Sequence, residues 1–110
     1  MIKRYACTAD LAAIREIWSA AFPEDSVTDR DRFLETLRLA EECLVAEENG
    51  VPISMVCTLP VPYGEEWLQY IYAAATLPSH RGRGVFAELL NTALSEAKQQ
   101  GATGSFAISS

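Results

Sequence analysis

Apolar positions recur at helical spacing in three stretches of the chain. The first stretch predicts a helix that begins after Thr8, which can cap it, and ends at Pro23. A second helix is expected from about Thr28, and a long third helix from Val85 to Gln99, followed by Gly101 as its stop. The apolar face of the first helix comprises Leu11, Ile14, Trp18, Ala21 and Phe22.

Shorter runs rich in β-branched and aromatic residues predict five strands. The dipeptide Asn49-Gly50 predicts a hairpin between two of them, and residues 60–66 are expected to form a loop of turn residues and charges. The resulting order is β-α-α-β-β-β-α-β, which predicts an α/β (α+β) fold with a mixed sheet. The expected strands are Ile2–Cys7, Cys43–Glu47, Pro52–Leu59, Trp67–Thr76 and Gly104–Ile108.

Length and composition favour one small domain over residues 1–110, because about half of the residues are apolar and no linker is visible. The formal net charge of −6 disfavours nucleic acid and anionic membrane surfaces as partners. The N-terminus has no apolar segment behind its charges, and no run approaches the length of a membrane span. We therefore expect a cytoplasmic protein.

The chain has three cysteines, Cys7, Cys43 and Cys57, and no CxxC pair. We interpret them as reduced thiols, with Cys43 and Cys57 as small apolar core residues in strands. With a single histidine and no clustered ligands, no metal site is expected.

The most informative segment is the basic, glycine-containing turn at residues 77–84, between a strand and a long helix. The first N–H groups of a helix lack internal partners and carry the positive end of its dipole. Glycines allow close backbone approach, and Arg81 and Arg83 add charged donors, so the turn suits a phosphate or pyrophosphate. It lacks the lysine of a P-loop and the acidic partner of a dinucleotide-binding fingerprint.

The turn and its surroundings resemble the GNAT (GCN5-related N-acetyltransferase) family. The hexapeptide Arg81-Gly82-Arg83-Gly84-Val85-Phe86 resembles the family's motif A, Q/R-x-x-G-x-G/A. Residues 74–78 resemble the end of its fourth strand, and residues 5–22 resemble its first strand and helix. The similarity extends over essentially the whole chain.

This resemblance implies that acetyl-CoA is a co-substrate and that a primary amine, on a small molecule or a peptide, is the acceptor. A β-bulge in the fourth strand would separate it from the fifth strand and admit the thioester. The backbone would hold the pyrophosphate at the turn and the pantetheine arm along the strand. The implied coenzyme-A-binding residues are Ala74, Ala75, Thr76, Arg81, Gly82, Arg83, Gly84, Val85 and Phe86.

The chain departs from the family pattern in two places. Phe86 occupies a position where glycine or alanine is usual, and its spacing from Leu89 and Leu90 favours a core position over one against the pyrophosphate. Family members continue past the fifth strand with a helix and two strands, so this chain is expected to be incomplete at the C-terminus. The open edge of strand 104–108 could then be covered in a homodimer.

The catalytic residues stay unassigned. Glu65 and Glu66 are either loop charges or a general base, Tyr63 is a loop residue that could line an acceptor site, and Tyr70 and Tyr72 share one sheet face. The leading hypothesis is an N-acetyltransferase. The alternative is a non-catalytic acyl-CoA-binding or interaction module, and a third is an unrelated α/β nucleotide-binding protein.

Overall fold

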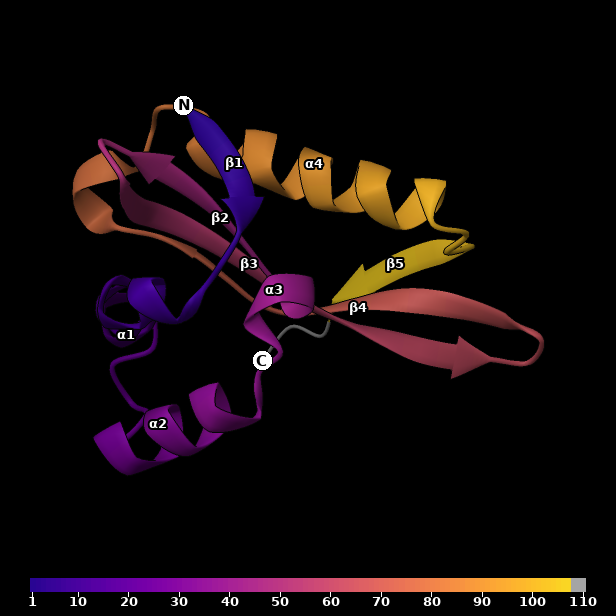
Figure 1. The fold of residues 1–110 in the computed structure, drawn as a ribbon, viewed down its shortest axis with the longest axis horizontal. Coiled ribbons are helices and arrows are strands. Elements are labelled where there is room, and N and C mark those ends of the chain that lie inside the picture. The colour runs from indigo at the N-terminus through magenta and orange to yellow at the C-terminus, as the bar shows by residue number, and fades with distance from the viewer. Residues whose placement is uncertain (108–110) are drawn as a thin grey trace.

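A computed structural model describes residues 1–107 and contains a mixed sheet with helices on both faces (Figure 1). The predicted order of elements is confirmed, with one addition, the short helix α3 before the second strand. The strands are β1 (Ile2–Tyr5), β2 (Cys43–Glu48), β3 (Val51–Tyr63), β4 (Glu66–Thr76) and β5 (Gly104–Ala107). The helices are α1 (Leu11–Ala21), α2 (Val27–Thr36), α3 (Leu39–Glu42) and α4 (Val85–Gln99).

The sheet has the order β1-β2-β3-β4-β5. The first four strands pair antiparallel, and the predicted turn at Asn49-Gly50 joins β2 to β3 with both residues at positive φ. β5 pairs parallel to β4, which requires the α4 crossover. Within the described residues β4 is the only neighbour of β5, and the expected dimer at its open edge stays a prediction.

Two apolar layers hold the helices against the sheet. On one face α1 packs through Ile14, Ile17 and Trp18. On the other face α4 packs through Val85, Leu89 and Ala93, as Figure 1 shows. A 15-residue amphipathic helix between two neighbouring strands thereby fixes where the turn before it lies relative to the end of β4.

Cys43 and Cys57 are buried in the first layer, as predicted, and their Sγ atoms lie 3.9 Å apart on paired strands. Both thiols are free, and so is the exposed Cys7. Burial and the hydrogen bond to Cys43 raise the pKa of Cys57 well above its ordinary value.

The prediction of a loop at residues 60–66 is wrong. β3 continues to Tyr63 and β4 begins at Glu66, so a long hairpin extends from the sheet. Pro60 and Pro62 argued against a strand, but β2 pairs with β3 only as far as Cys57. Beyond that residue β3 is an edge strand, where a missing N–H group is tolerated.

The beginning of α1 also differs from the prediction. Thr8 does not cap it, and residues 8–10 form a 3-10 turn instead. The Asp10 carboxylate accepts the backbone N–H of Cys7 at 2.9 Å and two hydrogen bonds from the Arg4 guanidinium. Ile108, predicted in the last strand, lies outside the described residues. None of the helices in residues 1–107 is long and apolar enough to cross a membrane.

Candidate functional site

The turn before α4 presents a row of unpaired backbone N–H groups. Gly82 and Gly84 adopt positive φ, +82° and +76°. Within residues 1–107, the amides of residues 82–84 donate to no backbone carbonyl. The next amides belong to the first turn of α4, which has no side-chain cap because Gly84 is its N-cap residue. The segment therefore offers consecutive donors at the positive end of a helix dipole.

The space in front of this turn is open. A Cβ atom built on Gly82 or Gly84 would meet no other atom within 4 Å, so neither glycine is required by packing inside the protein. The positive φ angles are the local reason for glycine, since they aim successive amides outward at little conformational cost. Such a concave row of amides fits an anionic group of the size of a pyrophosphate.

The second part of the site is the free edge of β4. A register shift opposite Cys57 and Thr58 leaves Tyr72 as an extra residue in β4, which is a β-bulge. In the described residues, pairing of β4 with β5 ends at Ile71, immediately before this bulge. Residues 73–76 then pair with β3 on one side only. The expected bulge and the free strand edge are thus both present.

A cavity of about 330 Å³ connects the strand edge to the turn. Its walls come from the end of α1, the end of β4 and the start of α4, so three segments distant in sequence meet here (Figure 1). The lining residues are Ala21, Phe22, Ala74, Ala75, Thr76, Arg81 and Phe86. The small alanine side chains keep the strand edge accessible, and a flexible acyl chain could lie along it.

Phe86 is the residue for which the sequence prediction is wrong. It does not enter the core, because 40% of its surface is exposed and its ring lines the cavity. Leu89 fills the core position instead and is fully buried. Periodicity misled here because the buried face of α4 runs through Val85, Leu89, Ala93 and Ala97, which turns the neighbouring Phe86 away from the core.

The two arginines of the turn are placed differently. The Arg81 Nε donates to the carbonyl of Thr76 at 3.2 Å, so this side chain bridges the turn and the strand end. Arg83 is half exposed, and its Nη1 lies 3.6 Å from a carboxylate oxygen of Glu48. The His80 Nε2 lies 3.6 Å from the other oxygen of Glu48, and its Nδ1 contacts the Ser79 hydroxyl. Glu48, at the end of β2, was not singled out from the sequence because only the fold brings it to the turn.

The tyrosines of β4 share one face, as predicted. Tyr70 stacks on Phe106 of β5 with ring centroids 4.9 Å apart, and Tyr72 contacts Phe33 of α2 edge-on at 5.2 Å. Desolvation by burial raises the pKa of Tyr72 far above its ordinary value. Tyr72 is therefore protonated at neutral pH and packs against the core.

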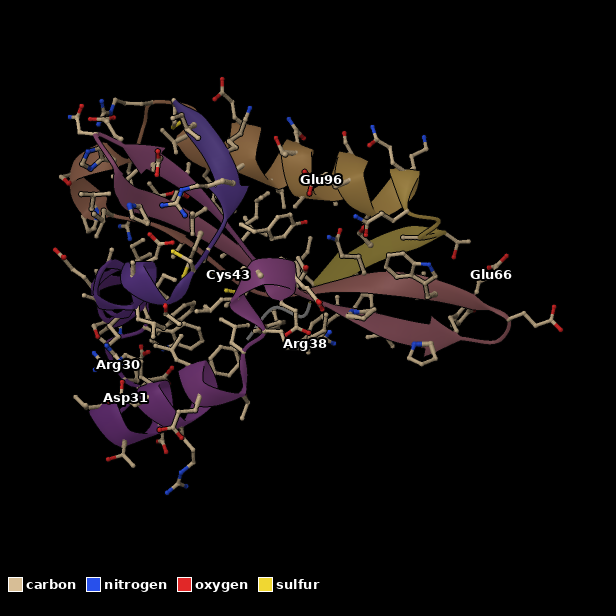
Figure 2. All side chains as sticks on the ribbon, viewed as in Figure 1. Arg30, Asp31, Arg38, Cys43, Glu66 and Glu96 are labelled. Atoms are coloured by element: carbon tan, nitrogen blue, oxygen red, sulfur yellow. The ribbon has the colours of Figure 1, made fainter. Side chains whose placement is uncertain are left out.

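The carboxylates considered as a general base lie elsewhere. Glu65 and Glu66 occupy the tip of the β3–β4 hairpin, and Figure 2 shows Glu66 at the end of the molecule opposite the glycine turn. Tyr63 lies at the same tip and is 63% exposed. These residues are surface charges and a surface ring of the hairpin. Within residues 1–107 no group of His, Cys, Asp and Glu is arranged to hold a metal ion.

Comparisons with known proteins agree with this geometry. The family model of the acetyltransferase (GNAT) family matches residues 11–109. The chain belongs to the GNAT acetyltransferase family. It is therefore an acyl-CoA-dependent N-acyltransferase by class. No protein with a curated description matches it significantly in sequence.

Solved structures of acetyltransferases share the fold. A GNAT family acetyltransferase from Brucella melitensis, in complex with acetyl-CoA, is 27% identical with a TM-score of 0.81, covering 99% of this chain and 75% of that one. An aminoglycoside 6'-N-acetyltransferase, AAC(6')-IG, from Acinetobacter haemolyticus is 21% identical with a TM-score of 0.83, covering 100% and 80%. AAC(6')-Iy in complex with CoA is 18% identical with a TM-score of 0.81, covering 99% and 76%.

Proposed function

We propose that this protein transfers an acetyl group from acetyl-CoA to a primary amine of a small molecule. The observation that carries the proposal is one cavity whose wall includes the end of β4 together with Arg81 and Phe86, which lie just before and at the end of the unpaired amides at residues 82–86. Coenzyme A is an anionic pyrophosphate joined to an amide-containing arm. The site offers donors for the first part and an unpaired strand edge for the second.

The residues of the turn would hold the pyrophosphate. The amides of Gly82 to Phe86 supply hydrogen bonds without needing to move, and Arg83 supplies a mobile positive charge. Arg81 is already fixed to the carbonyl of Thr76, so its charge lies where the turn meets the strand. We expect Arg81 to order the turn more than it contacts phosphate.

The end of β4 would hold the pantetheine arm. Within residues 1–107, Ala74 and Ala75 pair with β3 on one edge and with no strand on the other, and the carbonyl of Thr76 accepts from Arg81. An extended arm with amide groups can pair with such an edge as an added strand does. Phe86 closes the cavity beside it as an apolar wall.

The thioester supplies an activated acyl group to the attacking amine, and the bulge at Tyr72 marks where the acceptor must meet it. The strands β4 and β5 begin to pair next to this point, so the route to the thioester is narrow. Two of the solved structures similar to this chain are aminoglycoside acetyltransferases by name. This supports a small-molecule amine as acceptor.

An acceptor screen tests the proposal. The protein is incubated with acetyl-CoA and separate amines, namely an aminoglycoside, an aralkylamine, a polyamine and a lysine peptide, and the acetylated products are detected by mass spectrometry. We expect acetylation of at least one small-molecule amine by the natural protein and loss of product with Gly84→Val. If acetyl-CoA binds but no amine is acetylated, the alternative of a non-catalytic acyl-CoA-binding module replaces this proposal.

A further inference from the structure

A second cavity, of about 340 Å³, lies where the β3–β4 hairpin leaves the rest of the sheet. The end of β1, the helix α3, the two hairpin strands and the C-terminal half of α4 surround it. It shares no lining residue with the cavity beside Phe86. Ala93, which lines it, follows Gly84 by nine residues, or about 13 Å along the helix at about 1.5 Å per residue. The two cavities are therefore separate.

The space exists because β2 ends early at this point and α4 has only small side chains there. β2 stops pairing with β3 at Cys57, and the hairpin continues alone with Thr58 and Leu59 at the cavity wall. On the opposite side α4 presents only the small side chains of Ala93 and Ala97. The volume is at the lower end of the range of about 300–1,000 Å³ that is typical of small-molecule sites.

Glu42 gives this cavity its chemistry. The residue is only 8% exposed, and one carboxylate oxygen accepts the backbone N–H of Arg38 at 3.0 Å. No cationic side chain of residues 1–107 forms an ion pair with it, because the Arg38 guanidinium pairs with Glu41 instead. The second oxygen has no hydrogen-bond partner in that range and is not sealed from solvent, and Glu42 is one of the residues that line the cavity. A nearly buried carboxylate without a cation is costly, and a cationic guest would compensate that cost.

Two aromatic residues complete the lining. The Tyr5 hydroxyl donates to the Glu96 carboxylate at 2.6 Å, which leaves the lone pairs of its oxygen free to accept from a guest. Burial and the neighbouring Glu96 carboxylate raise the pKa of Tyr5 to about 12, so it stays neutral. Trp67 adds an indole ring that can contact a cation or an apolar body. Figure 2 labels Arg38, the residue before α3, and Glu96 on α4, and both helices flank the cavity.

We propose that this cavity binds a small primary ammonium ion with a short apolar body, with its charge at Glu42 and its body between Trp67 and the alanines of α4. The site is distinct from the acyl-CoA site and does not depend on the function proposed above, because the two share no residue. It gives an acidic enzyme a second place at which to bind an organic amine.

A calorimetric titration of the full 110-residue chain with phenethylammonium tests the site, with the neutral analogue 2-phenylethanol as the matched ligand. We expect one site per chain for the ammonium ion and binding of the alcohol that is weaker by about tenfold or more, since hydrogen bonds to charged groups are worth that much. Glu42→Gln keeps the shape of the side chain and removes its charge, so it should weaken binding of the ammonium ion by a similar factor. Glu65→Gln, at the exposed hairpin tip and outside the cavity lining, should leave its affinity unchanged.

Equal binding of the amine and the alcohol, no binding of either, or unchanged binding in Glu42→Gln would overturn the proposal. Should Glu42→Gln fail to fold, Ala40→Trp decides the question. Ala40 is exposed and lines the cavity, so the larger side chain blocks the entrance without disturbing the core. Binding of the ammonium ion that survives this block would also contradict the assignment. Titration with acetyl-CoA should give the same affinity for all these variants.

Discussion

The Arg81 Nε lies 3.2 Å from the carbonyl oxygen of Thr76 and donates a hydrogen bond to it. This bond ties the glycine turn to the last residue of β4, beside the strand edge. Because its acceptor is a neutral carbonyl, Arg81 keeps its full charge, and we expect it to position the turn. The charge of Arg83 faces the Glu48 carboxylate, which lies 3.6 Å away.

Arg83→Ala should weaken acetyl-CoA binding by about tenfold, because it removes one charge-assisted contact of about 1–2 kcal/mol. Glu48→Gln should tighten binding, because Glu48 now competes for Arg83 at 3.6 Å. The gain should be small and should disappear at high salt, since the pair is exposed to solvent. Titrations at two salt concentrations measure both effects. Weaker binding in Glu48→Gln would mean that Glu48 positions Arg83 instead of competing for it.

The variants Phe86→Ala and Leu89→Ala should differ in their effects, because one residue lines the cavity and the other, on the same helix, lies in the core. Leu89 is fully buried, so its truncation should lower the free energy of unfolding by about 2–5 kcal/mol. Phe86 is 40% exposed beside the strand edge, so its truncation should cost far less stability and should weaken acetyl-CoA binding. Chemical denaturation and ligand titration of the two variants give the comparison. A large loss of stability in Phe86→Ala would restore it to the core.

Acid should destabilise the protein through Asp10. Hydrogen bonds from Arg4 lower the pKa of this carboxyl from 3.8 to about 2. Because the pKa of Asp10 is lower in the folded state than in the unfolded state, its ionised carboxylate stabilises the fold above pH 3.8. This stabilisation is lost as the pH falls toward 2. Asp10→Asn should lower stability at neutral pH and flatten the stability profile across this window. Asp29→Asn, at an exposed carboxylate that forms no ion pair within residues 1–107, is the control and should leave the profile nearly unchanged.

The cysteines should differ sharply in reactivity. Cys7 is exposed, whereas Cys57 is fully buried beside Cys43 and its thiol pKa is raised. Iodoacetamide should therefore modify Cys7 in the folded protein, and all three cysteines only after unfolding. Peptide mass spectrometry locates the label. Rapid native labelling of Cys57 would show that the α1-side layer opens locally.

The parts of the fold that local chemistry dictates were predictable. The boundaries of α4 follow from its apolar spacing and its flanking glycines, and the anion-binding character of the turn follows from helix geometry. The hairpin at Asn49-Gly50 is equally local. For this reason the sequence alone predicted a coenzyme A site at this turn, and that site stays a prediction.

The remaining features depend on contacts between distant segments. The extension of β3 through Pro60 depends on where β2 stops, which no local pattern encodes. The exposure of Phe86 depends on which face of α4 meets the sheet, and the contact of Glu48 with Arg83 depends on the fold that brings β2 to the turn. Helix α3 has only four residues and no apolar period of its own. Each of these features is determined by how helices and strands pack against one another more than by local secondary-structure propensity.

The most direct test of the central claim is calorimetric titration of acetyl-CoA into three proteins, the natural chain, Gly84→Val and Gly64→Val. Both glycines have positive φ, +76° and +64°, with open space around them, so valine imposes similar backbone strain at either position. Only Gly84 lies in the amide row, whereas Gly64 lies at the far hairpin tip. The account predicts one site in the natural protein, retained in Gly64→Val and lost in Gly84→Val. Unchanged binding in a folded Gly84→Val would show that acetyl-CoA does not bind at this turn.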